Sequence, residues 1–240
     1  MKSLNKERLD KIISSQFNIS RSEAKTCIRR GQVLVGGTVA KDYGMLVMPE
    51  TEQIIFNGEQ LNYKKNIYII MNKPRGIVSA STDKRRKTVV DILPEELKRS
   101  GLFPAGRLDR DTTGLLIITD DGDFAHRIIS PKKKIKKTYI VWLDEDITPD
   151  ICRKFSEGVT LSDGTLCAPA KLTRIDKNVA EITITEGKYH QIKRMFGTVG
   201  IGVNELHRKS VGGLTLPENL SEGSSRELTE MEKNSIFMPV

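Results

Sequence analysis

The sequence predicts a two-domain α+β protein: a small helix–helix–hairpin unit over residues 1–60 and a larger domain over 61–240 built on a mostly antiparallel sheet. Two observations lead to this prediction. The first part carries apolar positions at helical spacing and then a short hairpin pattern, whereas the rest carries short apolar runs separated by turn residues. A polar junction, NGEQLNYKKN at 57–66, separates the two patterns, so we expect the boundary near residue 60.

Composition limits the classes of protein that fit. A chain of 240 residues can bury enough apolar surface in one or two domains to fold without disulfides. Its 39 Lys and Arg against 31 Asp and Glu leave a charge of +8, which favours a polyanionic partner such as nucleic acid or an anionic membrane surface. Cys27, Cys152 and Cys167 lie far apart and predict neither a disulfide framework nor a zinc site. Because no apolar run is long enough for a signal or a membrane span, we expect a cytoplasmic protein.

The first 40 residues predict two helices and a hairpin. Apolar residues at helical spacing give the first helix one apolar face, formed by Leu9, Ile12, Ile13 and Phe17. Ser20, followed three residues later by Glu23, is a capping box, which predicts the start of a second helix that ends at Gly31. Next come VLV at 33–35, two glycines and TV, a pattern typical of a hairpin with a two-residue turn.

The second helix is expected to carry a basic stripe. Arg21, Lys25 and Arg29 recur every four residues and so project from one side. A basic helix face is often simply exposed to solvent, so charge alone leaves its function open. The string RLDKIIS…SRSEAKTCIRRGQVLVGG, however, resembles the S4 RNA-binding domain over about residues 6–55. That resemblance implies that four side chains contact RNA phosphates: Arg21, Lys25, Arg29 and Arg30.

Short apolar runs predict the strands of the second domain: IYIIMNKP at 67–74, GLLIITDDG at 114–122, TYIVWL at 138–143 and VAEITITEG at 179–187. Two dense basic segments, DKRRK at 83–87 and PKKKIKK at 131–137, suit phosphate contacts, although loop charges alone mean little. Tyr139 and the three histidines, His126, His190 and His207, are typical of packed or capping residues when each is considered alone.

The segment GRLDRDTTGLLIITDDG at 106–122 places carboxylates in an otherwise basic chain. Asp109, Asp111 and Asp120 match part of a calcium-loop spacing, but Leu115–Ile118 predict a buried strand where that loop must offer oxygens. The hypothesis of a nuclease magnesium site is weakened by the same strand. It separates Asp109 from the acidic residues that begin at Asp120 by about 15 Å. The third hypothesis is one aspartate, Asp109, held in a loop before a buried strand and acting as a nucleophile without metal.

This segment resembles the central motif of the pseudouridine synthases, in particular the group that carries an S4 domain in front and acts on small-subunit ribosomal RNA. The similarity continues in order through MNKPRGIVSA at 71–80, KKTYIVWL at 136–143 and TEGKYHQIKRMFGTVG at 185–200. It implies an isomerase that converts one uridine of 16S ribosomal RNA to pseudouridine. An enzyme acting on large-subunit RNA and a non-catalytic assembly factor remain alternatives.

The resemblance also implies site residues. Asp109 matches the catalytic aspartate, Arg107 the arginine that fills the gap left by the extruded base, and Tyr139 the tyrosine that stacks on uracil. Lys193 takes the place of an arginine found in many related families and is expected to form an ion pair with Asp109. Isomerisation involves no redox or group transfer, so no cofactor and no catalytic metal are expected. The expected partner is ribosomal RNA, free or in a partly assembled small subunit, bound by a monomer.

Overall fold

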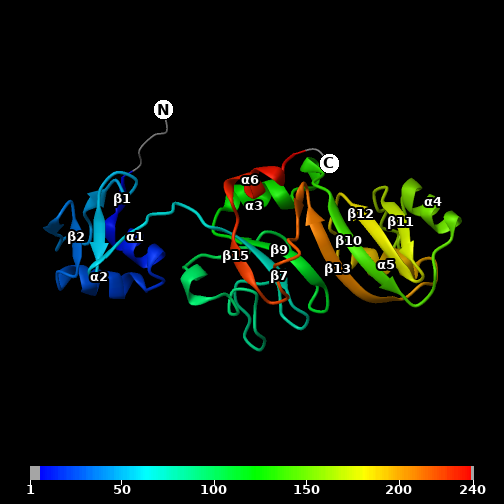
Figure 1. Cartoon of the computed structure of the whole chain (residues 1–240), viewed down its shortest axis with the longest axis horizontal. Helices are drawn as coiled ribbons and strands as arrows, with labels where there is room; N and C mark the ends of the chain where they lie inside the picture. The colour runs from blue at the N-terminus through cyan, green and yellow to red at the C-terminus, as the bar shows by residue number, and fades with distance from the viewer. Residues whose placement is uncertain (1–5, 239–240) are drawn as a thin grey trace. The chain divides into compact units, whose positions relative to one another are not determined.

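The computed structural model describes residues 6–238, and they form two units (Figure 1). The first unit holds the chain up to Ile67 together with Lys98–Leu102, and the second holds Tyr68–Leu97 and the chain from Phe103 onward. The sequence placed a boundary near residue 60, and the division by contacts falls between Ile67 and Tyr68.

The first unit contains the predicted helix–helix–hairpin arrangement. Its elements are β1 Glu7–Arg8, α1 Leu9–Gln16, α2 Arg21–Arg29, β2 Val33–Val35, β3 Thr38–Val39, β4 Leu46–Val47, β5 Ile54–Phe56 and β6 Glu59–Gln60. The capping box of α2 is confirmed: the backbone N–H of Glu23 donates to Ser20 Oγ over 3.1 Å, and that of Ser20 donates to Glu23 Oε2 over 2.8 Å. Strands β2 and β3 pair antiparallel as predicted. The apolar side of α2 packs inward, with Ala24 and Ile28 fully buried.

The second unit is built on a nine-stranded sheet. Seven strands run in the order β11-β12-β10-β13-β9-β7-β15, with β14 beside β13 and β8 beside β9. Their bounds are β7 Tyr68–Lys73, β8 Phe103–Pro104, β9 Thr113–Thr119, β10 Lys137–Leu143, β11 Lys171–Asp176, β12 Val179–Ile184, β13 Val203–Val211, β14 Leu214–Thr215 and β15 Ser225–Glu227. Only β9 and β13 pair in parallel among these described strands, so the prediction of a mostly antiparallel sheet is confirmed.

Helices pack around this sheet. They are α3 Gly122–Ile129, α4 Pro149–Glu157, α5 Gln191–Gly197 and α6 Glu230–Ser235, with short 3-10 turns at Glu95–Leu97 and Pro131–Lys133. Helices α3 and α6 lie together in Figure 1. Phe124 of α3 meets Phe237, which follows α6, edge to face. Asp121 accepts the Phe124 N–H over 3.0 Å as the N-cap of α3. Acidic residues that favour turns favour N-caps for the same reason, namely their bond to a nearby backbone amide.

The junction of β9 and β13 fixes the segment before β9. Gly114 has φ +99°, and a Cβ placed there would lie 2.4 Å from the carbonyl oxygen of Arg208. Only glycine permits this approach, which sets Thr113 opposite His207 at the start of the parallel pair. The loop that carries Asp109 therefore ends at a fixed point on the sheet. Among the helices of residues 6–238, none is long and apolar enough to cross a membrane.

Candidate active site

A small cavity of about 80 Å³ lies where the loop before β9 meets the loop 185–190 and the start of α5. Its lining includes Arg107, Asp109, Tyr139 and Lys193, which are all the site residues that the sequence predicted for the second domain. The chain brings them together from three separate segments. Tyr139 of β10 lies opposite Arg208 of β13, which in turn pairs with Gly114 at the start of β9. A carboxylate, a cation and an aromatic ring thus line one small cavity.

Asp109 lies in the irregular loop between β8 and β9, with 29% of its side chain exposed. Its Oδ1 is 3.4 Å from Nε2 of His190, a residue that the sequence gave no reason to choose. A single histidine is usually packed or capping, and only the fold shows that this one reaches the aspartate. His190 stands at the N-cap position of α5 in a left-handed backbone conformation, with φ 47°.

The expectation that Lys193 forms an ion pair with Asp109 is wrong. Lys193 Nζ instead donates to Asp111 Oδ2 over 2.6 Å. The hydrogen bond from Lys193 holds the pKa of Asp111 below its usual value. Two carboxylates two residues apart on one loop are equally available to a flexible lysine, and sequence spacing does not tell which of them the ammonium group contacts.

Tyr139 supplies the aromatic wall of the cavity. It lies in the middle of β10 between Ile182 of β12 and Arg208 of β13, and only 6% of it is exposed. Ile184 and Leu206 line the same cavity. An aromatic ring beside aliphatic side chains can hold a planar base by stacking. Arg107 is exposed at the rim and borders a second, larger cavity as well.

Comparisons with known proteins show the family to which this chain belongs. The RNA pseudouridylate synthase family model matches residues 67–198, and the S4 domain model matches residues 7–52. The chain belongs to the RNA pseudouridylate synthase family. It is 43% identical to an uncharacterized RNA pseudouridine synthase of Bacillus subtilis (strain 168), over 97% of this chain and 99% of that protein.

Other relatives carry more specific names. The synthase is 42% identical to a ribosomal small subunit pseudouridine synthase A of Vibrio cholerae, over 96% of this chain and 99% of that protein. It is 41% identical to the protein of that name from Escherichia coli (strain K12), over 95% and 99%. A solved pseudouridylate synthase shares 37% identity with a TM-score of 0.68, and covers 95% of this chain and 99% of its own.

The loop that carries Asp109 in this synthase is held from beneath by Lys73 of β7. This lysine is fully buried, and its ammonium group donates to the carbonyl oxygens of Pro74, Arg110 and Thr112 over 3.0, 3.3 and 2.9 Å. Burial lowers the pKa of Lys73 to about 8, which leaves it mostly charged at neutral pH. Sequence reasoning missed this residue, although it lies in the quoted MNKP motif.

Ser79 also binds the backbone of this loop, at the residue before Asp109. Its hydroxyl donates to the carbonyl of Leu108 over 2.9 Å and accepts the Leu108 N–H over 3.1 Å. Lys73 and Ser79 together fix the backbone on both sides of Asp109. Within residues 6–238, no group of three or more His, Cys, Asp or Glu side chains is placed to hold a metal ion.

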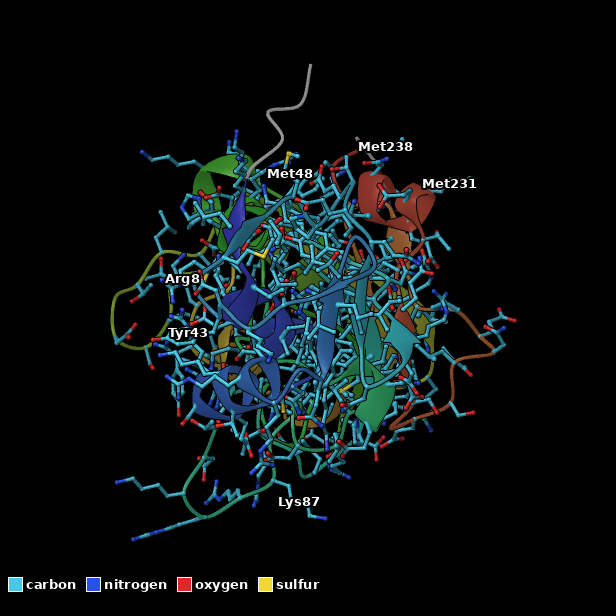
Figure 2. The ribbon with its side chains drawn as sticks, turned by 90° about the vertical axis from the view of Figure 1, so that its left-hand side faces the viewer. Arg8, Tyr43, Met48, Lys87, Met231 and Met238 are labelled. Atoms are coloured by element: carbon cyan, nitrogen blue, oxygen red, sulfur yellow. The ribbon has the colours of Figure 1, made fainter. Side chains whose placement is uncertain are left out.

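The four S4 residues singled out by sequence do not share one environment. Arg21 donates to the buried Asp10 over 2.9 Å, whereas Arg30 is exposed after the end of α2. Lys25 and Arg29 lie 5.2 and 4.8 Å from the ring centre of Tyr43. Arg8 approaches the same ring at 6.0 Å, and Figure 2 labels these two residues. We call Arg8, Lys25, Arg29 and Tyr43 the Tyr43 cluster.

Proposed function

We propose that this synthase converts one uridine of small-subunit ribosomal RNA to pseudouridine, with Asp109 as the nucleophile. The observation that carries the proposal is that Asp109, Tyr139 and Lys193 line one small cavity. The near full-length similarity to enzymes named ribosomal small subunit pseudouridine synthase A supports the choice of RNA.

The reaction requires a base outside the helical stack. The bond from C1′ to N1 breaks, the base turns, and C5 bonds to C1′, while C5 loses a proton and N1 gains one. Because a base inside a duplex cannot turn in this way, the uridine must be extruded or unpaired. In our proposal Tyr139 stacks on the uracil ring, Asp109 forms the transient covalent bond to the substrate, and Arg107 occupies the space that the base leaves. The isomerisation has no net oxidation or reduction and calls for no cofactor.

Lys193 and His190 have different parts in this proposal. Lys193 pairs with Asp111 and not with Asp109. It contributes positive charge to the cavity, and the Asp109 carboxylate stays available to the substrate. His190 lies against Asp109 and limits where that carboxylate can point. A nucleophilic carboxylate must be held in position to attack, and the contact with His190 serves this purpose.

The N-terminal domain, placed by sequence at residues 1–60, serves in our proposal as a docking module. Arg21, Lys25, Arg29 and Arg30 contact RNA phosphates, and Tyr43 holds two of them close together. We further propose that the synthase works in the cytoplasm as a monomer on ribosomal RNA within a partly assembled small subunit. The S4 match and the basic surface support RNA binding by this unit.

Mapping of pseudouridines in ribosomal RNA tests this proposal. RNA from cells that lack this chain is compared with RNA from the same cells complemented with the wild-type chain or with Asp109→Asn. We expect one small-subunit pseudouridine to disappear, and only the wild-type chain to restore it. Loss of a pseudouridine from large-subunit RNA instead would show that the enzyme acts on that RNA and would contradict the proposed substrate. An unchanged map would contradict catalysis.

A further inference from the structure

Tyr189 is an aromatic side chain that the proposed chemistry does not use. It lies in the loop between β12 and α5, and 76% of it is exposed. Its ring stacks on the imidazole of His190, with centroids 3.9 Å apart and 18° between the planes. An exposed ring fixed on one face by a neighbour resembles the platforms on which RNA-binding proteins stack bases.

The fold holds this ring close to the reacting carboxylate. His190 has its backbone in the left-handed region, with φ 47° and ψ 34°, and its Nε2 lies 3.4 Å from Asp109 Oδ1. The carbonyl of Tyr189 accepts a hydrogen bond from Arg194 over 3.4 Å. A non-glycine residue in this conformation costs free energy, and such strain persists where the surroundings impose it. Tyr189 and His190 thus form a stacked pair attached to the wall of the active site.

The pair borders a second cavity of about 630 Å³, much larger than the inner one. The two cavities share Asp109 and His190, so they adjoin at the catalytic carboxylate. The outer one is also lined by Arg86 and Arg110, both exposed and able to bind phosphate. It therefore combines a stacking ring with cations, directly beside the space for the target base.

We propose that the outer cavity binds the nucleotide adjacent to the target uridine, with its base stacked on the Tyr189 ring and its phosphate near Arg86 and Arg110. Successive nucleotides are covalently linked, so a uracil in the inner cavity delivers its neighbour to the outer one. This inference rests on the proposed function. It adds a base-contacting residue that sets which RNA context is accepted, and it makes His190 the residue that positions Tyr189.

The test uses the full chain and three short RNAs cut from small-subunit RNA around the mapped uridine. One RNA is intact, the second lacks the base 5′ to the uridine, and the third lacks the base 3′ to it. On intact RNA we expect Tyr189→Ala to weaken binding by about 5- to 100-fold, the range for one lost base stack. Tyr189→Phe keeps the ring and should bind within about twofold of wild type. Met231→Ala, at an exposed side chain on α6 labelled in Figure 2, is the matched control.

The RNA without the neighbouring base decides the outcome. If the base stacks on Tyr189, its removal should weaken the wild-type chain and leave Tyr189→Ala almost unchanged, so that the two proteins become equal. The inference is overturned if Tyr189→Ala binds intact RNA like wild type, or if its defect persists on both RNAs that lack a neighbour. Pseudouridine formation by the wild-type chain, measured in parallel, reports separately on the proposed function.

Discussion

The two units of this synthase arrange charge in opposite ways. In the N-terminal unit, cations close together in the sequence gather on one aromatic ring and one buried acid, and Lys25 and Arg29 face Tyr43 instead of a carboxylate. In the catalytic unit, carboxylates lie against basic side chains from distant segments: Asp111 pairs with Lys193, and Asp109 lies beside His190. Docking to phosphates needs cations left uncompensated, whereas covalent chemistry needs a carboxylate held ionised and in place.

The largest effect expected from a cation is at Lys193. Lys193→Met should lower turnover on the order of 100-fold, because Asp111 loses its partner and the cavity loses a positive charge beside the nucleophile. Lys193→Arg should retain part of the activity, since the charge persists while the donor geometry changes. Single-turnover rates with saturating RNA measure this. Equal rates for Met and Lys would show that the charge pairing of the catalytic unit has no part in the chemistry.

Next in size is the effect of Lys73, whose three carbonyl partners include two on the loop of Asp109. Lys73→Met removes one donor from each of these carbonyls, of which that of Arg110 keeps the Gly76 N–H at 2.7 Å, and should cost about 1–3 kcal/mol of unfolding free energy. It should also lower turnover about 10- to 100-fold through a displaced loop. The matched control is Lys137→Met, which removes a half-buried lysine that donates to one carbonyl, that of Ile135. Similar turnover losses in both variants would contradict a positioning role for Lys73.

A smaller effect on affinity tests the docking side of the comparison. Replacing Lys25 and Arg29 by alanine should flatten the slope of log K against log salt by about 1 to 2 units, because two phosphate contacts are lost. The rate at saturating RNA should stay near that of wild type. Alanines at Lys154 and Lys177, both exposed on the catalytic unit, provide the control. An unchanged slope would mean that the Tyr43 cluster does not dock RNA.

The smallest effect on turnover is expected at Asp10. Its fully buried carboxylate accepts hydrogen bonds from Arg8 and Arg21, and these partners lower its pKa to about 2. A lowered folded-state pKa means that the contribution to stability is present above the unfolded value near 3.9 and is lost as pH falls toward 2. Asp10→Asn should therefore lower the free energy of unfolding at pH 7 by about 2 kcal/mol. Denaturation at several pH values should show this difference shrinking below pH 4, and a constant difference would contradict it.

What the sequence could predict differs between the units for a physical reason. The capping box at Ser20 and the hairpin at 33–39 depend on residues within a few positions of each other, and both are confirmed. The cavity depends on strands β9, β10 and β13 meeting across the sheet, and there local patterns contain little information. The resemblance to a known family predicted residues that line this cavity, but it predicted the wrong partner for Lys193.

The residues that sequence reasoning missed share one property. Lys73 and His190 act through contacts with a loop more than 30 positions away in the chain, and neither stands in a pattern that periodicity detects. A lysine within an apolar strand is itself a signal, because a buried ammonium group must find acceptors. Lys73 in YIIMNK could have been selected on that ground.

The rate of pseudouridine formation by Asp109→Asn on small-subunit ribosomal RNA, measured together with RNA affinity, tests the central claim most directly. Asparagine keeps the size of the side chain but cannot act as the nucleophile. We predict no detectable pseudouridine, RNA affinity within a few-fold of wild type, and full wild-type activity in the presence of EDTA. Turnover by Asp109→Asn, or loss of wild-type activity on chelation, would contradict the assignment of Asp109 as a nucleophile that works without metal.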